Sequence, residues 1–174
     1  NYGSQLQAYV TQMIFDRLGL SNETICIDGL KKEINRAKYR YFLSRIFDVN
    51  TIKDKLSTVK KTLAKKMHKD YARNLRVRNG CFSDFEKGMF NISRKFSSKR
   101  ELSDAANDYS AFVVGSDQLW LPSNIAADYY TLNFVPQSIP KIAFATSFGV
   151  SELPSKQEKK ARLFLKRLNF VSVR

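Results

Sequence analysis

Two patterns of apolar and polar positions alternate along the chain, one typical of helices and one typical of buried strands. Short apolar runs rich in β-branched residues predict strands at residues 23–28, 110–115, 141–146 and 169–174. The first 20 residues begin with a glycine-containing loop and continue as a helix that Gly19 ends. One face of that helix is apolar and carries Leu6, Tyr9, Val10, Met13, Ile14 and Leu18.

Capping and turn residues predict the remaining elements. Residues 97–106 contain a short helix capped by Ser97 or Ser98, with Glu101 in the position of a capping box. A further helix is predicted at 155–168, with Ser155 near its N-cap. The other parts are predicted as a mixed segment with loops over 81–109, a loop over 121–130 and an extended piece over 129–135. Because strands alternate with helices, the predicted fold class is α/β, with a Rossmann-like parallel sheet.

The length of the chain bounds its organisation. At 174 residues, of which 43% are hydrophobic, the chain can bury one α/β core and is too short for two. We therefore predict one lobe over residues 1–174, with an insertion at 31–78. The first residue is not Met, and the last six residues are an apolar run without a cap, so we expect this lobe to be incomplete at both ends.

Nearly all of the excess positive charge lies in residues 31–78, which hold sixteen Lys or Arg against four Asp or Glu. That segment has a net charge of +12 out of +14 for the whole chain. Its periodicity predicts a basic helical hairpin, with one stripe that includes Ile52, Leu56, Val59, Leu63, Met67, Tyr71 and Leu75.

Three interpretations of this basic segment remain open. The plainest is a solvated helical surface that packs through its apolar stripe. A peripheral contact with an anionic membrane surface or an anionic lipid-linked substrate is the second. Nucleic acid is the least favoured partner, because no recognised nucleic-acid-binding motif accompanies the charge. His68, the single histidine, lies among lysines and should be exposed, without a metal role.

The remaining composition excludes several classes of protein. No apolar run is long enough to cross a bilayer and no signal peptide is present, so we predict a cytoplasmic protein, peripheral at most at the inner face of the membrane. Cys26 and Cys81 are far apart and form no CxxC pair, so we expect two buried free thiols. No metal site or cofactor motif is found.

Three polar turns follow apolar elements and form the candidate site. They are NYGSQ at residues 1–5, GSDQLW at 115–120 and TSFG at 146–149. In open parallel sheets, ligands bind beyond the carboxyl ends of the strands, so these turns should line one crevice. Glycines allow backbone N–H groups to approach a ligand, and the first turn opens a helix whose N-terminus favours an anion.

The second turn offers the most chemistry. Asp117 can orient a sugar hydroxyl or act as acid or base, Gln118 can donate and accept, and Trp120 can support a sugar ring. The structural alternative is a strand-end Asx turn followed by a core tryptophan. Because no Walker loop, GxGxxG, HExxH or GxSxG motif is present, spacing alone leaves the chemistry open.

The same segments resemble the polysaccharide pyruvyl transferase family. NYGSQLQAY, DYSAFVVGSDQLWLP, YYTLNFVP and KIAFATSFG occur in the order and approximate spacing of that family's pattern, from residue 1 to residue 149. Three positions depart from it: Phe144 replaces a usual tyrosine, Thr146 a usual alanine and Leu121 a usual asparagine. The last change removes a polar group that could have touched a sugar.

The resemblance implies transfer of pyruvate from phosphoenolpyruvate to two hydroxyls of one sugar, in a cell-surface polysaccharide or its lipid-linked precursor. It implies two Rossmann-like lobes, as in GT-B glycosyltransferases, of which this chain is the N-terminal one and inactive alone. No metal or cofactor is implied. Asp117 is the catalytic candidate; the substrate-binding candidates are Asn1, Tyr2, Gly3, Ser116, Gln118, Trp120, Ser147, Phe148, Gly149 and Arg174. The alternatives are a nucleotide-sugar glycosyltransferase of the same fold and a noncatalytic domain that binds anions or membranes.

Overall fold

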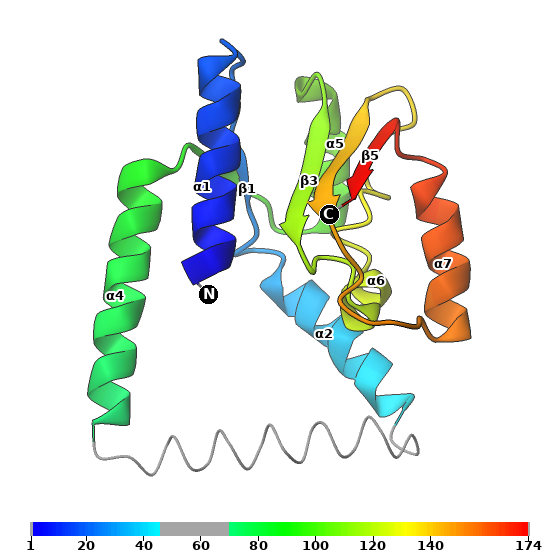
Figure 1. Ribbon diagram of the computed structural model, residues 1–174, viewed down its shortest axis with the longest axis horizontal. Helices are drawn as coiled ribbons and strands as arrows, with labels where there is room; N and C mark the ends of the chain where they lie inside the picture. Colours follow the sequence, from blue (N-terminus) through cyan, green and yellow to red (C-terminus); the bar gives the residue numbers. More distant parts are fainter. Residues whose placement is uncertain (1, 46–69, 174) are drawn as a thin grey trace. The chain divides into compact units, whose positions relative to one another are not determined.

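The protein is shown as a computed structural model, of which residues 2–45 and 70–173 are described (Figure 1). The chain divides into two compact units. The first contains residues 1–41 and 92–174, and the second contains residues 42–91. These bounds differ from those of the predicted insertion at 31–78.

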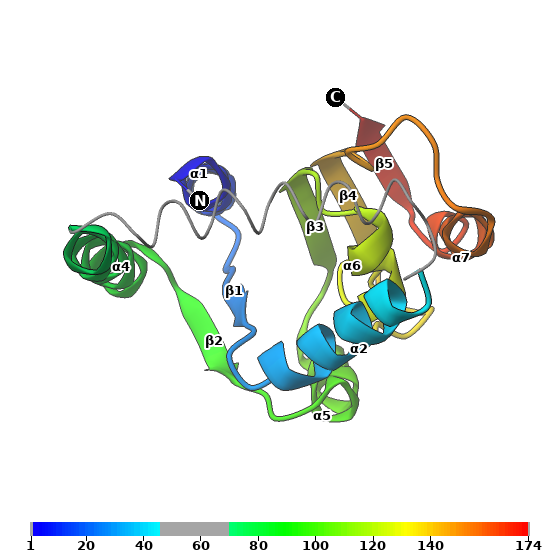
Figure 2. The same ribbon diagram turned by 90° about the horizontal axis from the view of Figure 1, so that it is seen from below.

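All strands of the first unit are paired in parallel. Strand β1 (Thr24–Cys26) pairs with β2 (Ile92–Lys95), and β3 (Phe112–Asp117), β4 (Lys141–Thr146) and β5 (Phe170–Val173) form a second sheet in that order (Figure 2). Phe112 lies opposite Lys141 at one end of this sheet, and Asp117 lies opposite Thr146 at the other. The predicted α/β class with parallel strands is confirmed.

Helices precede and connect these strands. They are α1 (Tyr2–Arg17), α2 (Lys31–Leu43), α5 (Lys99–Asp104), the 3-10 helix η1 (Ala105–Asp108), α6 (Pro122–Ala127) and α7 (Ser155–Leu165). The predicted stop at Gly19 is confirmed by its positive φ of 71°. The predicted cap of α5 is also confirmed, because Ser98 Oγ accepts a hydrogen bond from the backbone N–H of Glu101 at 3.2 Å.

The core of the first unit is built around aromatic side chains. The ring of Trp120 lies 5.3 Å from that of Phe164 on α7 and 5.4 Å from that of Phe148, and its side chain is 1% exposed. Phe112 on β3 packs edge-to-face against Phe134, with 5.6 Å between the ring centres. Ile34 of α2 also belongs to this core. The first helix of the predicted basic segment 31–78 therefore packs against the core.

Two expectations about residues 121–135 are wrong. Residues 122–127 form helix α6 rather than a loop, and residues 128–140 form turns rather than an extended piece. Asp128 and Leu132 have φ of 57° and 55°, in the left-handed region, which is incompatible with a strand. The apolar residues of this stretch are nevertheless buried, which is why its sequence resembles a strand: Tyr129, Leu132, Phe134 and Val135.

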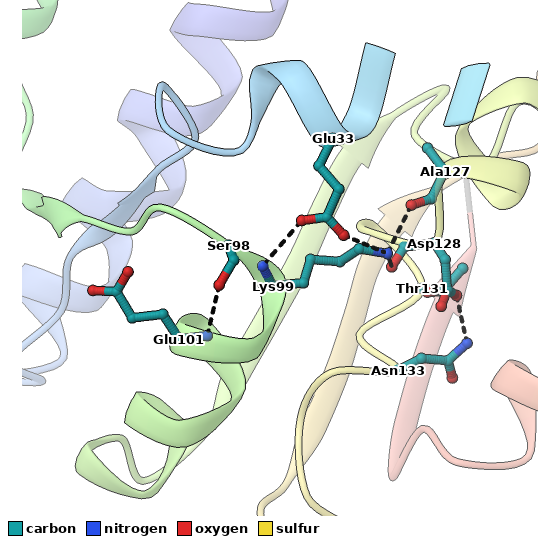
Figure 3. Close-up of polar contacts among 8 residues, drawn as sticks. All are labelled: Glu33, Ser98, Lys99, Glu101, Ala127, Asp128, Thr131 and Asn133. Atoms are coloured by element: carbon teal, nitrogen blue, oxygen red, sulfur yellow. Dashed lines mark hydrogen bonds and ion pairs between the residues drawn. The ribbon is translucent and has the colours of Figure 1, made fainter. Parts of the chain in front are cut away.

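The turns after α6 are held by charged side chains from elsewhere in the chain (Figure 3). Lys99 Nζ donates to the carbonyl oxygens of Ala127 and Asp128 at 3.0 and 3.2 Å. Asp128 Oδ1 accepts from Thr131 Oγ1 at 2.7 Å and from Asn133 Nδ2 at 2.6 Å. These contacts fix the turn at the start of the segment 128–140.

Two further cations hold the rest of this segment. Arg167 donates to the carbonyl oxygens of Asn133 at 2.9 Å and Val135 at 2.7 Å. Lys141 is fully buried, and its Nζ donates to the carbonyl oxygens of Pro136 at 2.8 Å and Ile139 at 2.6 Å. Burial, and to a smaller extent the charge of Arg167, lower the pKa of Lys141.

The segment before β3 also differs from its prediction. Helix α4 (Tyr71–Met89) continues through the first part of what was expected to be mixed structure, and β2 follows it at once. The expected hairpin stripe from Ile52 to Met67 and the single histidine, His68, lie outside the described residues. In the described part of the second unit, α4 buries none of its side chains completely.

Candidate functional site

The three predicted polar turns meet at the carboxyl ends of β3 and β4. Ser4 Oγ, in the first turn of α1, donates a hydrogen bond to Asp117 Oδ2 at 3.2 Å. The backbone N–H of Ser147 donates to the carbonyl oxygen of Asp117 at 3.0 Å, and the N–H of Trp120 donates to that of Ser147 at 3.1 Å. The structure therefore brings Ser4 into contact with segment 115–120, and segment 115–120 into contact with segment 146–149.

Asp117 lies at the centre of these contacts. Its φ of 85° is in the left-handed region, and its carbonyl oxygen accepts from the N–H groups of both Leu119, at 2.8 Å, and Ser147. Among the described residues, its side chain accepts one hydrogen bond, through Oδ2, while Oδ1 accepts none. The backbone of Asp117 is thus fixed, and one carboxylate oxygen is left for a ligand.

The N-terminal turn of α1 lies beside the Asp117 side chain. Ser4 lies in the first turn of α1, where the helix leaves backbone N–H groups unpaired and carries a partial positive charge. The contact with Ser4 places the Asp117 carboxylate close to that turn. The N-terminus of a helix can also attract an anionic group of a ligand.

Gln118 and Gly149 lie against each other. Gly149 has a φ of 64°, and a Cβ atom there would lie 2.9 Å from Gln118 Cδ. Two independent reasons therefore favour glycine at residue 149: its left-handed backbone conformation and the closeness of the glutamine side chain. The predicted candidates Gln118, Ser147 and Gly149 are brought together beside Asp117.

Trp120 and Phe148 are placed differently from the other candidates. The indole N–H of Trp120 donates to the carbonyl oxygen of Tyr130 at 3.0 Å, and the ring is enclosed by Phe148 and Phe164. A sugar ring has no access to its face, so this arrangement speaks against stacking. It fits the alternative of a strand-end turn followed by a core tryptophan.

Ser116 faces a groove of about 340 Å³ beside this site. The groove is mainly apolar and lies between α1 and the ends of β3 and β4. Its other lining residues are Leu6, Gln7, Val10, Thr11, Ile14, Phe144 and Ala145. Thr146 Oγ1, opposite Asp117 in the sheet, is buried without a hydrogen-bond partner in the described structure.

The structure does not describe the side chains of three candidates at the chain ends. Asn1 and Arg174 lie outside the described residues, and nothing is described of the Tyr2 side chain. Gly3 lies inside α1, which begins at Tyr2, so the expected glycine loop is wrong. Sequence reasoning overlooked Ser4, although a hydroxyl at the start of a helix beside a predicted ligand turn was a visible signal.

Metal ligands and cysteines are further candidates for chemistry in the part of the chain that the structure describes. In ranges 2–45 and 70–173, no group of three His, Cys, Asp or Glu side chains is arranged to hold a metal ion. Cys26 and Cys81 are free thiols, as predicted, but the expected burial of both is wrong: Cys26 is only partly buried, and Cys81 is exposed on α4. None of the described helices is both long and apolar enough to cross a membrane.

Comparison with models of known protein families identifies the family of the chain. The model of the family described as polysaccharide pyruvyl transferase matches residues 1–174, which is the whole chain. No curated protein and no solved structure matches the chain.

Proposed function

Because the chain belongs to the polysaccharide pyruvyl transferase family, we propose that it takes part in transfer of pyruvate from phosphoenolpyruvate to two hydroxyls of one sugar. The acceptor would be a cell-surface polysaccharide or its lipid-linked precursor, and the product a cyclic ketal. We further propose that the described sheet belongs to the N-terminal lobe of a GT-B-like enzyme, with the active cleft between two lobes, and that this lobe is inactive alone.

The reaction defines what the enzyme must supply. A proton added to the methylene carbon of phosphoenolpyruvate makes a methyl group and leaves an oxocarbenium-like centre at the adjacent carbon. One sugar hydroxyl adds there and loses its proton; the carbon–oxygen bond to phosphate then breaks, and the second hydroxyl closes the ketal. The proton lost by one sugar hydroxyl replaces the proton that was added to the methylene carbon. The proton lost by the second hydroxyl is taken up by the departing phosphate. An acid, a base and cations for carboxylate and phosphate are needed.

The position of Asp117 is the observation that supports this proposal most directly. Its carboxylate lies where three motif segments meet, is held through one oxygen by Ser4 and keeps Oδ1 available. A carboxylate in such a position can accept the proton of an attacking sugar hydroxyl. The amide of Gln118 can bind a neighbouring hydroxyl, and Arg174, at the end of the strand run, is proposed to contact an anion.

The proposal is tested with the complete natural protein, phosphoenolpyruvate and acceptor glycans. We expect mass spectrometry to detect the added pyruvyl mass together with release of inorganic phosphate. Asp117→Asn should lose most of this activity at an unchanged unfolding temperature. The matched control is Asp84→Asn, which alters an exposed carboxylate on α4 and should keep full activity.

Three results would contradict the proposal. Ketal formation by Asp117→Asn at the parental rate would remove any acid, base or orienting role from that residue. Transfer of a sugar from a nucleotide sugar, without any use of phosphoenolpyruvate, would favour the glycosyltransferase alternative instead. Binding of anionic vesicles or DNA without turnover would favour a noncatalytic domain.

We also propose that the basic segment 31–78 contacts the anionic inner face of the membrane, where a lipid-linked acceptor would be found. Its described parts support this, because Lys32, Arg36 and Arg40 of α2 are exposed. On α4, Arg76 and Arg78 are exposed as well. Clustered Lys and Arg gain about 1 kcal/mol each near such a surface. The enzyme would then be cytoplasmic and peripheral.

A further inference from the structure

The first turn of α1 contacts the side chain of Asp117 across 113 residues of sequence. Ser4 Oγ donates to Oδ2 at 3.2 Å. This bond lies at the surface and is not part of the hydrogen bonding that forms α1 or the β3–β4–β5 sheet. The bond joins two side chains, and it therefore restrains the orientation of the Asp117 carboxylate.

The backbone hydrogen bonds of Asp117 fix its main chain but do not restrain its side-chain torsions. The left-handed φ and the two hydrogen bonds to its carbonyl oxygen, from Leu119 and Ser147, determine where Cα and Cβ lie. Two side-chain torsions remain, and each sets which oxygen points in which direction. Among the described residues, Ser4 makes the hydrogen bond that restrains them.

We propose that Ser4 is a positioning residue, which holds Oδ2 of Asp117 so that Oδ1 receives the acceptor hydroxyl. The inference rests on the proposed function, in which Asp117 is the group that touches the acceptor. A carboxylate that rotates freely spends only part of its time in the productive orientation, and a held one avoids that entropic loss at each turnover. The hydroxyl of Ser4 remains a donor throughout, because serine does not ionise in this role.

The effect of removing the hydroxyl follows from the strength of one exposed, charge-assisted hydrogen bond. Ser4→Ala should lower kcat for ketal formation about three- to tenfold. The KM for phosphoenolpyruvate should be unchanged, since the donor substrate does not contact Ser4 in this proposal. Ser4→Thr keeps a hydroxyl on the same atom and should restore kcat to within about twofold.

The decisive measurement is a double-mutant cycle with Asp117→Asn in the complete natural protein. In the Asp117→Asn background, the further change Ser4→Ala should produce no additional loss of kcat, because the carboxylate that Ser4 orients is no longer present. Thermal unfolding of each variant, expected within about 2 °C of the parent, separates positioning from loss of fold.

The outcomes distinguish the two proposals. If Asp117→Asn keeps the parental rate, or the parent forms no ketal, the proposed function fails. If Asp117→Asn loses activity while Ser4→Ala keeps its full kcat, the function stands and the positioning role is wrong. An equal loss from Ser4→Ala in both backgrounds, or no rescue by Ser4→Thr, also overturns it, because Ser4 would then act independently of Asp117.

Discussion

The close approach of β3 to β4 at Gly115 predicts that no side chain is tolerated there. A Cβ atom at residue 115 would lie 2.0 Å from the carbonyl oxygen of Phe144 and 3.0 Å from its carbonyl carbon. Ordinary contact begins at 3.4 Å, so the first distance is 1.4 Å too short. Both atoms belong to the backbone of the paired strand, and no flexible side chain can move aside. Gly115→Ala must therefore push the strands apart.

The size of this effect can be estimated from its parts. Overpacking of a well-packed region costs about 1–3 kcal/mol, and loss of the neighbouring ladder hydrogen bonds adds about 1 kcal/mol for each bond. We expect Gly115→Ala to lower the free energy of unfolding by about 3 kcal/mol or more, a large part of the roughly 5–15 kcal/mol of a typical domain. Because Asp117 follows two residues later, its carboxylate should be displaced as well.

Urea unfolding followed by tryptophan fluorescence measures this loss. The chain has a single tryptophan, Trp120, which is buried in the same unit as Gly115. Gly3→Ala is the matched control, since a Cβ there meets nothing within 4 Å, and it should stay within about 1 kcal/mol of the parent. If Gly115→Ala is as stable as Gly3→Ala, the strands do not approach as closely as described, and the reasoning is refuted.

Two further predictions concern pH and surface charge. Burial is the main cause that raises the pKa of Tyr129. Burial, together with a hydrogen bond to a glutamate, raises the pKa of Tyr109 to about 12. The folded protein therefore holds both phenol protons more tightly than the unfolded protein does. The free energy of unfolding should therefore fall as pH rises from 10 towards 12, and it should fall less steeply in Tyr109→Phe. The pKa of Lys141 is lowered by folding, so this lysine makes stability rise with pH, but only below its usual pKa of 10.5. A flat unfolding temperature over this range would contradict the assignment. Phosphatidylserine vesicles should bind the protein in low salt, and Arg76→Gln with Arg78→Gln should weaken binding by about 1 kcal/mol per charge. Equal binding to neutral vesicles would disprove the charge-based contact, whereas preference for DNA would assign the basic surface to nucleic acid.

The parts of the fold that depend on local pattern could be predicted from the sequence. Strands β3, β4 and β5 are short apolar runs, and the cap at Ser98 depends on residues within one turn. The meeting of the polar turns could be expected as well, because parallel strands place their carboxyl ends at one edge. These features are set by neighbours in sequence or by the geometry of the fold class.

The parts that depend on distant contacts could not be predicted. The stretch 129–135 has the composition of a strand, yet it forms turns that depend on Arg167 and, at Asp128 just before it, on Lys99, which are remote in sequence. The burial of Trp120 depends on Phe164, 44 residues away. The contact between Ser4 and Asp117 joins two motifs that sequence reasoning had assigned to one crevice without pairing their side chains.

The cations that hold the segment 128–140 bind mainly main-chain oxygens, which every amino acid possesses. Lys99, Lys141 and Arg167 therefore constrain the path of this segment while leaving much of its own sequence unconstrained. Divergent homologues could exchange solvent-facing residues of this loop whose side chains do not contact the anchoring cations, for example at Ser138, and still retain its shape. In a directed-evolution library, diversity placed at those positions should be tolerated, whereas diversity at the three anchoring cations should not.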